Sequence, residues 1–340
     1  MRKDVIQETA STAVSVELIA LFSRASRNSP RVIVPLNTSA LNGCGAGPTF
    51  YCVHSLPGTV SDFVPMARLL DTSIPIFGIQ VPPAKIQDPI FTSSIEAVAA
   101  HYVEVLTAFQ PAGPIALGGW SVGATIALEM AQQLRALGRE VTLLVAIEDA
   151  LTNTVPRPSR WNPLYYAMLI RNLVRRFIYD DLLQQGSLVL FAKRCASRLK
   201  AWTKVAIASL RGESASRTHV IDGFIDASRF SPEHMAFMRL LFLAGDRYVP
   251  HAYTGRVTVY AATVPPVHEL DEAEAVWATI ASQAEVIRIK GLHSNLVNMP
   301  QVIPLAKHLR ATLLDAFPEQ DNPPPLQSTV TALDGSKVSA

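Results

Sequence analysis

A pentapeptide near the middle of the chain carries its clearest chemical signal. Residues 119–123 read Gly-Trp-Ser-Val-Gly, which places Ser121 in a G-x-S-x-G pattern. An apolar run before it predicts a strand, and a helical pattern follows without a break. Such a strand-to-helix turn exposes a serine as a nucleophile, and the helix N-terminus favours a developing anion. We interpret Ser121 as a catalytic nucleophile; a glycine-rich turn that merely holds a serine is the alternative.

A nucleophilic serine needs a base, which in this arrangement follows the serine and an acid along the chain. Among the eight histidines, His293 follows the last predicted strand and precedes the last predicted helix. That order and position make His293 our candidate base. We interpret His54, in the first strand-to-helix loop, and His308, within the last helix, as structural or surface residues.

The acid that orients the base should follow another strand. The predicted strand 141–147 ends in two adjacent carboxylates, Glu148 and Asp149. Only one of them can face the histidine, because successive side chains of a strand diverge. Glu269 and Asp271, after the next strand, are fallback candidates, so the choice of acid stays open.

An oxyanion that forms on the substrate needs two backbone N–H donors. We expect one from Val122, directly after the nucleophile. The other should come from the loop 54–58, after the first strand of the alternating series. Pro57 has no N–H, which leaves Ser55 or Leu56, and we take Leu56 as the candidate.

The elements that must position these residues alternate along the chain. Alternating strands and helices predict an α/β fold with a mostly parallel, doubly wound sheet. Strands are predicted at 50–54, 76–81, 114–120, 141–147, 256–262 and 284–290. Helices are predicted at 61–70, 92–109, 122–137, 271–281 and 300–317.

The alternation is interrupted between residues 151 and 255, where only helical patterns occur. We interpret this block as a lid inserted above the carboxyl ends of the strands, where ligands bind in open α/β sheets. Residues 1–45 are predicted to be an N-terminal extension and linker, and residues 46–318 the α/β domain. Residues 319–340 are rich in proline and polar residues, which predicts a disordered tail.

Composition restricts the class of protein further. The chain has 340 residues, of which 49% are hydrophobic and 17% charged, and this allows a large core. It has no apolar run long enough to span a membrane and no signal-peptide pattern. Three cysteines fit neither a disulfide framework nor a zinc site, so we expect a cytoplasmic protein without a metal. We expect no nucleic-acid partner.

Charge is distributed unevenly although the net charge is only +2. Between residues 157 and 217 there are twelve Lys and Arg against three acids. This is either a solvated helical face or a docking surface for an acidic partner or a phosphate-bearing substrate.

In these motifs the chain resembles the type I thioesterase domains of nonribosomal peptide and polyketide synthases. The resemblance runs from about residue 32 to 314. It rests on the segments 34–37, 50–54, 118–124, 129–131, 291–293 and 298–300. It implies the α/β-hydrolase fold with a helical lid.

The resemblance also implies a reaction and a partner. Members of this family act on an acyl chain that is thioesterified to the phosphopantetheine arm of a carrier protein. Ser121 would accept the acyl group, and water or an internal nucleophile would release it as an acid or a ring. The enzyme would need no cofactor of its own and would act on a carrier protein or synthase, for which a basic lid is suited.

Two positions depart from the family pattern. The family acid is normally an aspartate 27 residues after the serine, which corresponds here to Glu148, with Asp149 one position later. The loop 54–58 also lacks the His-Pro and the paired glycines common in the family. Other readings are a carboxylesterase or lipase, a stand-alone editing thioesterase, and a non-catalytic binding module on the same fold.

Overall fold

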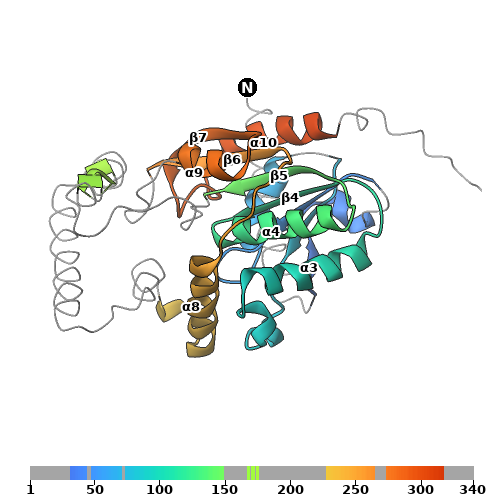
Figure 1. Ribbon diagram of the computed structural model, residues 1–340, viewed down its shortest axis with the longest axis horizontal. Coiled ribbons are helices and arrows are strands. Elements are labelled where there is room, and N and C mark those ends of the chain that lie inside the picture. Colours follow the sequence, from blue (N-terminus) through green and yellow to red (C-terminus); the bar gives the residue numbers. More distant parts are fainter. Residues whose placement is uncertain are drawn as a thin grey trace, which may run out of the picture.

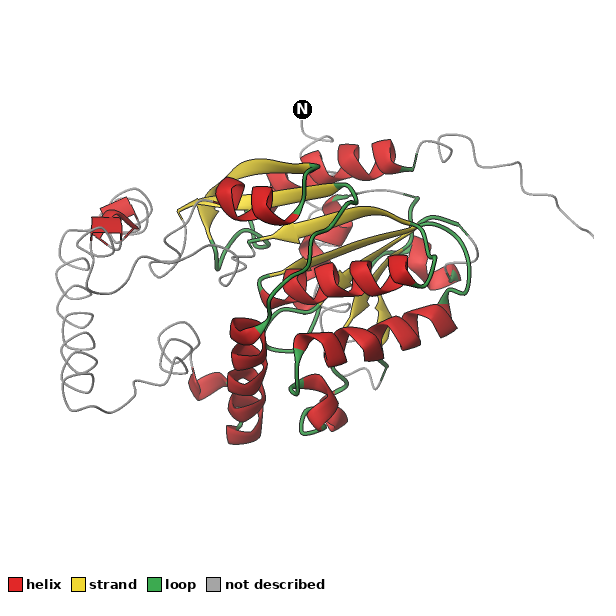
Figure 2. Cartoon of the chain, viewed as in Figure 1, coloured by secondary structure: helices red, strands yellow, loops and turns green. Residues whose placement is uncertain are grey.

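The computed structural model describes five continuous segments and a few shorter ones. The continuous segments are 31–43, 47–70, 73–148, 227–264 and 273–317, and the shorter ones are 167–168, 170–172 and 174–175. The described residues form one seven-stranded sheet with helices on both faces (Figures 1 and 2). The predicted α/β architecture is confirmed.

The sheet is mostly parallel and doubly wound, with the strand order β1-β3-β2-β4-β5-β6-β7. Only β1 is antiparallel to its neighbour, and the other pairs are parallel. The strands are β1 (Ile33–Pro35), β2 (Thr49–Val53), β3 (Ile76–Ile79), β4 (Ile115–Trp120), β5 (Val141–Ile147), β6 (Val257–Val264) and β7 (Ala284–Leu292).

Six α-helices are described along their length, and two of them begin with a capping serine. They are α2 (Val64–Leu69), α3 (Ile95–Phe109), α4 (Val122–Ala136), α8 (Pro232–Arg247), α9 (Ala273–Ile280) and α10 (Val302–Ala316). The hydroxyls of Ser94 and Ser231 accept hydrogen bonds from the first turns of α3 and α8. After α4, Gly138 has a φ of 76°, which suits glycine at a helix C-terminus.

Two hydrophobic layers form because successive strand residues point to opposite faces. Tyr51 and Val53 of β2 belong to the layer that contains residues of α3, α4, α8 and α9. Phe50 and Cys52 belong to the other layer, with α2 and α10. Burial of both faces explains why the central strands read as continuous apolar runs.

The N-terminal boundary of the domain differs from the expectation. Val34 of β1 pairs with Gly78 of β3, so a segment assigned to the linker 1–45 is part of the sheet. A three-residue edge strand is too short to show an alternating pattern, and its pairing depends on a strand more than forty residues away. The α/β unit therefore begins before residue 46. The proposed tail 319–340 and most of the lid 151–255 lie outside the described residues.

Candidate active site

The turn around Ser121 is fixed by backbone contacts. Ser121 joins β4 to α4 with φ 57° and ψ −131°, a conformation that is strained for a residue with a side chain. A Cβ on Gly119 would lie 2.2 Å from the carbonyl carbon of Gly123, and one on Gly123 would lie 2.3 Å from the carbonyl oxygen of His54. The turn can therefore close only with glycine at both positions, and the predicted strand-to-helix geometry is confirmed.

Glu148 follows β5 and turns its carboxylate into the interior. The residue is 7% exposed, and its N–H donates to the carbonyl of Tyr260 at 2.8 Å. Pairing between β5 and β6 ends at Ile147 and Tyr260, while β6 continues to Val264. In a continuing parallel ladder, the N–H of Ala262 would bond to the next backbone carbonyl of β5.

At that position the side-chain carboxylate of Glu148 takes the place of the backbone carbonyl as acceptor. The N–H of Ala262 donates to Oε1 of Glu148. Glu148 has a φ of 51°, in the left-handed region, which takes the chain off the strand direction just after β5 ends. One carboxylate oxygen is thus held by the sheet, and Oε2 is left for another partner.

That partner is His293, which follows the end of β7. Its Nδ1 lies 3.3 Å from Oε2 of Glu148, close enough for an ion pair but not aligned for a hydrogen bond. Catalytic hydrogen bonds of ligand-free enzymes are often long or poorly aligned and tighten with substrate. The imidazole side chain is 28% exposed, so it is accessible from solvent.

Trp120 connects the turn at Ser121 with the loop that carries His293. Its indole N–H donates to the backbone carbonyl of His293 at 3.2 Å, and the two rings lie 6.0 Å apart. Because Trp120 directly precedes Ser121, this contact holds the carboxyl ends of β4 and β7 together. The structure thus brings Glu148, His293 and the Ser121 turn to one edge of the sheet, whereas Asp149, Glu269 and Asp271 lie outside the described residues.

The two predicted oxyanion donors lie in neighbouring segments. Val122 is the first residue of α4, and the first N–H groups of a helix have no acceptor within the helix. The close contact of Gly123 with the carbonyls of Val53 and His54 sets this helix end against the loop 54–58. No described residue accepts a hydrogen bond from the N–H of Leu56.

His54 has a structural role, as the sequence predicts. It is fully buried, its Nδ1 donates to the carbonyl of Ser55 at 2.7 Å, and its Nε2 accepts from the hydroxyl of Tyr102 at 2.8 Å. Burial lowers the pKa of His54 to about 4, so the ring is neutral near pH 7. His308 contacts the hydroxyl of Tyr260 through Nδ1 at 3.0 Å.

Sequence reasoning missed two features of the site. The indole of Trp120 and its acceptor are 173 positions apart, so no local pattern could reveal the contact. The hydroxyl of Ser55 is buried and has no hydrogen-bond partner among the described residues. An unpartnered buried hydroxyl next to the loop donors is a further polar group that could face a ligand.

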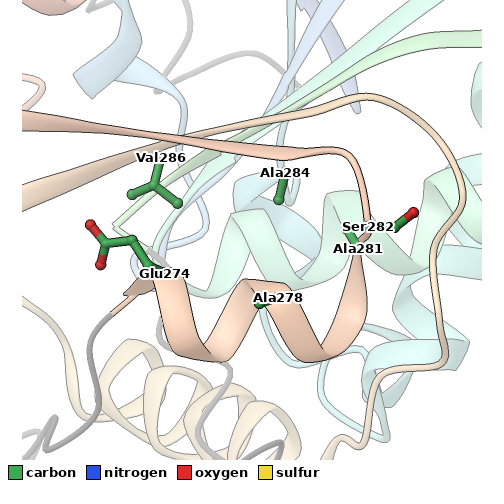
Figure 3. A pocket seen from close by; sticks show the side chains of 6 residues that line it. All are labelled: Glu274, Ala278, Ala281, Ser282, Ala284 and Val286. Atoms are coloured by element: carbon green, nitrogen blue, oxygen red, sulfur yellow. The ribbon is translucent and has the colours of Figure 1, made fainter.

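A separate cavity of about 300 Å³ lies between α9 and β7 (Figure 3). It contains none of the predicted site residues. Its carboxylate, Glu274, is paired with Arg288, which lowers the pKa of Glu274. The cavity is lined by Glu274, Ala278, Ala281, Ser282, Ala284 and Val286.

The described residues contain neither a membrane-spanning helix nor a metal cluster. None of their helices is both long and apolar enough to cross a membrane. They contain no group of three or more His, Cys, Asp or Glu side chains arranged to hold a metal ion.

Comparison with known proteins finds similarity to a thioesterase domain and to peptide and polyketide synthases. The family model "Thioesterase domain" matches residues 48–162. The chain is 33% identical to a dimodular nonribosomal peptide synthase of Bacillus subtilis over 129 residues, which are 38% of this chain and 5% of that protein. It is 30% identical to the non-reducing polyketide synthase crz7 of Cladonia metacorallifera over 180 residues, 51% of this chain and 8% of that protein. The chain thus spans less than a tenth of either relative.

Solved structures support the same fold. The NocB thioesterase domain, in covalent complex with a fluorophosphonate nocardicin G analog, has a TM-score of 0.55 and 20% identity and covers 83% of this chain and 100% of that one. The four-domain nonribosomal peptide synthetase AB3403 has a TM-score of 0.54 and 20% identity, over 83% of this chain and 20% of that one. Residues 48–162 are therefore similar to a thioesterase domain, the relatives in sequence are nonribosomal peptide and polyketide synthases, and the solved structures share the fold of the described residues.

Proposed function

We propose that this domain is a serine thioesterase that releases an acyl, polyketide or peptidyl chain from the phosphopantetheine arm of a carrier protein. The contact between His293 and Glu148 is the observation that supports the proposal, because an imidazole and a carboxylate lie 3.3 Å apart at the edge of the sheet that holds the Ser121 turn. A histidine beside a buried carboxylate at that position has no evident role in the core. It fits a serine–histidine–carboxylate triad.

Ser121 begins the reaction. Its Oγ attacks the thioester carbonyl, and Nε2 of His293 takes the hydroxyl proton, since Nδ1 faces Glu148. The carbonyl oxygen becomes an oxyanion, to which the N–H groups of Val122 and Leu56 donate hydrogen bonds. Collapse breaks the carbon–sulfur bond, and the proton on His293 passes to the departing pantetheine thiolate.

The second half of the reaction frees the acyl chain. Water, or a hydroxyl or amine of the chain itself, attacks the acyl-serine ester as His293 removes its proton. The product leaves as an acid or as a ring, and Ser121 recovers its proton from His293. Glu148 keeps Nδ1 protonated and stabilises the imidazolium that forms in each half.

The carrier protein and the location of the enzyme belong to the same proposal. The relatives named above are synthases, which favours a carrier protein as the partner. Most of the basic segment 157–217, which we expect to suit an acidic carrier, lies outside the described residues. Cys52 is a free, buried thiol, and a free thiol fits a reducing cytoplasm.

Mass spectrometry with a panel of acyl-pantetheine thioesters tests the proposal. We expect an acyl adduct on Ser121 and faster turnover of the thioesters than of simple aryl esters. A fluorophosphonate probe should label Ser121 alone, and Ser121→Ala should show neither adduct nor turnover. Faster turnover of aryl esters would indicate a carboxylesterase. A protein that neither reacts with the probe nor turns over any ester would be a binding module.

A further inference from the structure

Helix α8 lies against both backbone segments of the proposed oxyanion hole. It packs beside α3 and α4 (Figure 1). Nε2 of its His234 lies 2.8 Å from the carbonyl oxygen of Pro57. At the other end of the helix, a Cβ on Gly245 would lie 3.3 Å from Cγ2 of Val122. One helix therefore contacts the loop of one candidate donor and the side chain of the other.

The contact with Pro57 is a hydrogen bond whose direction is fixed. A carbonyl oxygen can only accept, so Nε2 of His234 must carry the proton and donate. The imidazole is partly buried and lies near two aromatic rings, with centroid distances of 5.0 Å to Phe230 and 6.0 Å to Phe237. Packing of this kind restricts the rotamers of His234 and keeps the donor aimed at the loop.

The carbonyl of Pro57 differs from the neighbouring carbonyls of the loop 54–58, because its hydrogen-bond donor belongs to α8. The carbonyl of Ser55 accepts from the N–H of Gly58 at 2.9 Å and from the His54 ring at 2.7 Å. The carbonyl of Gly58 accepts from the N–H of Val81 at 2.9 Å. Pro57, between them, receives its hydrogen bond from His234 of α8.

Phe237 adds an apolar contact at the same place. It is 2% exposed, and a Cβ on Gly58 would lie 3.1 Å from a carbon of its ring. Gly58 has a φ of 79°, so the turn needs a glycine there, and the ring of Phe237 covers it closely. The peptide between Pro57 and Gly58 is thus held on one side by His234 and covered by Phe237.

The helix is itself anchored to the nucleophile helix. The hydroxyl of Tyr248, which follows α8, donates to Oε2 of Glu129 on α4 at 2.7 Å. Gln133 donates to the other oxygen of that buried carboxylate at 2.8 Å. Since α4 begins directly after Ser121, α8 spans the distance between the nucleophile helix and the loop of the second donor.

We infer that His234 is a positioning residue of the oxyanion hole. It touches no substrate; its hydrogen bond to Pro57 holds the turn that presents the N–H of Leu56. Small displacements of an oxyanion donor are costly, because these donors act by being fixed before charge develops. This inference rests on the proposed thioesterase function. It gives α8, which belongs to the predicted insertion 151–255, a part in the chemical step.

Steady-state kinetics of two His234 variants test the inference. His234→Ala removes the donor, and we expect kcat for an acyl-pantetheine thioester to fall about tenfold to a hundredfold, less than the loss of a direct oxyanion donor, with KM little changed. His234→Gln keeps an N–H donor and should recover most of the loss. Inactivation by the fluorophosphonate should slow in parallel in His234→Ala, because phosphonylation also places charge in the hole. His251→Ala, at an exposed histidine after α8, is the control and should match wild type.

Three results would overturn the inference. They are a wild-type kcat in His234→Ala, a loss confined to KM, and a loss that accompanies a lower melting temperature and is not recovered by glutamine. Ser121→Ala separates this inference from the proposed function. If that variant is active, the thioesterase mechanism itself fails; if it is inactive while His234→Ala is unimpaired, only the role of His234 is wrong.

Discussion

The Ser121 turn and the Glu148–His293 pair lie at the same edge of one sheet, but different contacts hold them. At the turn, backbone meets backbone, as Gly123 meets the carbonyl of His54. In the pair, a carboxylate meets an imidazole and an indole N–H holds the loop. Close backbone contacts require glycine at fixed positions, so the turn leaves a short motif in the sequence. Contacts between side chains that are far apart along the chain leave no such motif. The two halves should also respond differently to mutation.

The largest effect is expected from Gly123→Ala, which breaks the backbone contact. The new Cβ would lie 2.3 Å from the carbonyl oxygen of His54 and 2.5 Å from that of Val53. We expect the free energy of unfolding to fall by about 3 kcal/mol and fluorophosphonate labelling of Ser121 to disappear. Chemical denaturation and labelling give the two readouts.

Gly138→Ala is the matched control, in the turn that ends the same helix. No atom lies within 4 Å of the new Cβ, although the φ of 76° makes alanine strained there. Stability should fall by only about 1 kcal/mol, and labelling should persist. If Gly123→Ala were as stable and reactive as wild type, the backbone would not be what fixes the turn.

His293→Ala should remove activity and leave stability almost unchanged. We expect kcat to fall by roughly 10³ to 10⁶, the range seen when triad members are removed. The free energy of unfolding should change by no more than about 1 kcal/mol, because the side chain is partly exposed and makes no aligned hydrogen bond through Nδ1. Turnover and denaturation of one preparation measure both. If His308→Ala lost the activity and His293→Ala kept it, the assignment of the base would be wrong.

Glu148→Gln tests the acid, because it removes the charge and keeps the shape. We expect a loss of roughly 10³ to 10⁴ in kcat, since the imidazolium forms without its partner. Asp149→Asn should remain near wild type in the same assay. The reverse pattern would make Asp149 the acid, and two active variants would move the search to Glu269 and Asp271.

The last prediction concerns the effect of pH on stability through His54, which lies on the side of the site that backbone contacts hold. Its pKa in the folded protein is lowered to about 4 from an ordinary value of 6.5. The unfolded chain therefore binds the proton first as the pH falls, and stability is lost between these two values. We expect a loss of about 3 kcal/mol across this range, at about 1.4 kcal/mol per pH unit. His54→Gln should lack that contribution, which denaturant titrations at several pH values would show as a shallower slope.

Much of the fold could be predicted because its signals are local. The strand expected at 141–147 is β5 in the structure, and the helix expected at 122–137 ends one residue earlier, at Ala136. Buried parallel strands read as apolar runs, and glycine marks the end of the helix. β1 escaped prediction because three residues show no period, and only their pairing with β3 makes them a strand.

The site could be predicted only where chain order or a motif determines it. The turn at Ser121 and the place of His293 after the last strand follow from such order. The choice of acid does not, because the orientation of Glu148 depends on its left-handed backbone and on the N–H of Ala262, 114 positions away. The contact between His234 and Pro57, 177 positions apart, is hidden for the same reason.

The two edges of the described sheet bear on how the chain behaves at high concentration. An edge strand exposes unpaired backbone groups to which a strand of another molecule can add, and such addition leads to aggregation. At one edge β1 is only three residues long and ends in Pro35. At the other, β7 carries the exposed charges of Glu285, Arg288 and Lys290. Both features discourage strand addition, so the domain should resist edge-to-edge polymerisation, and contacts with other chains should use its helical faces.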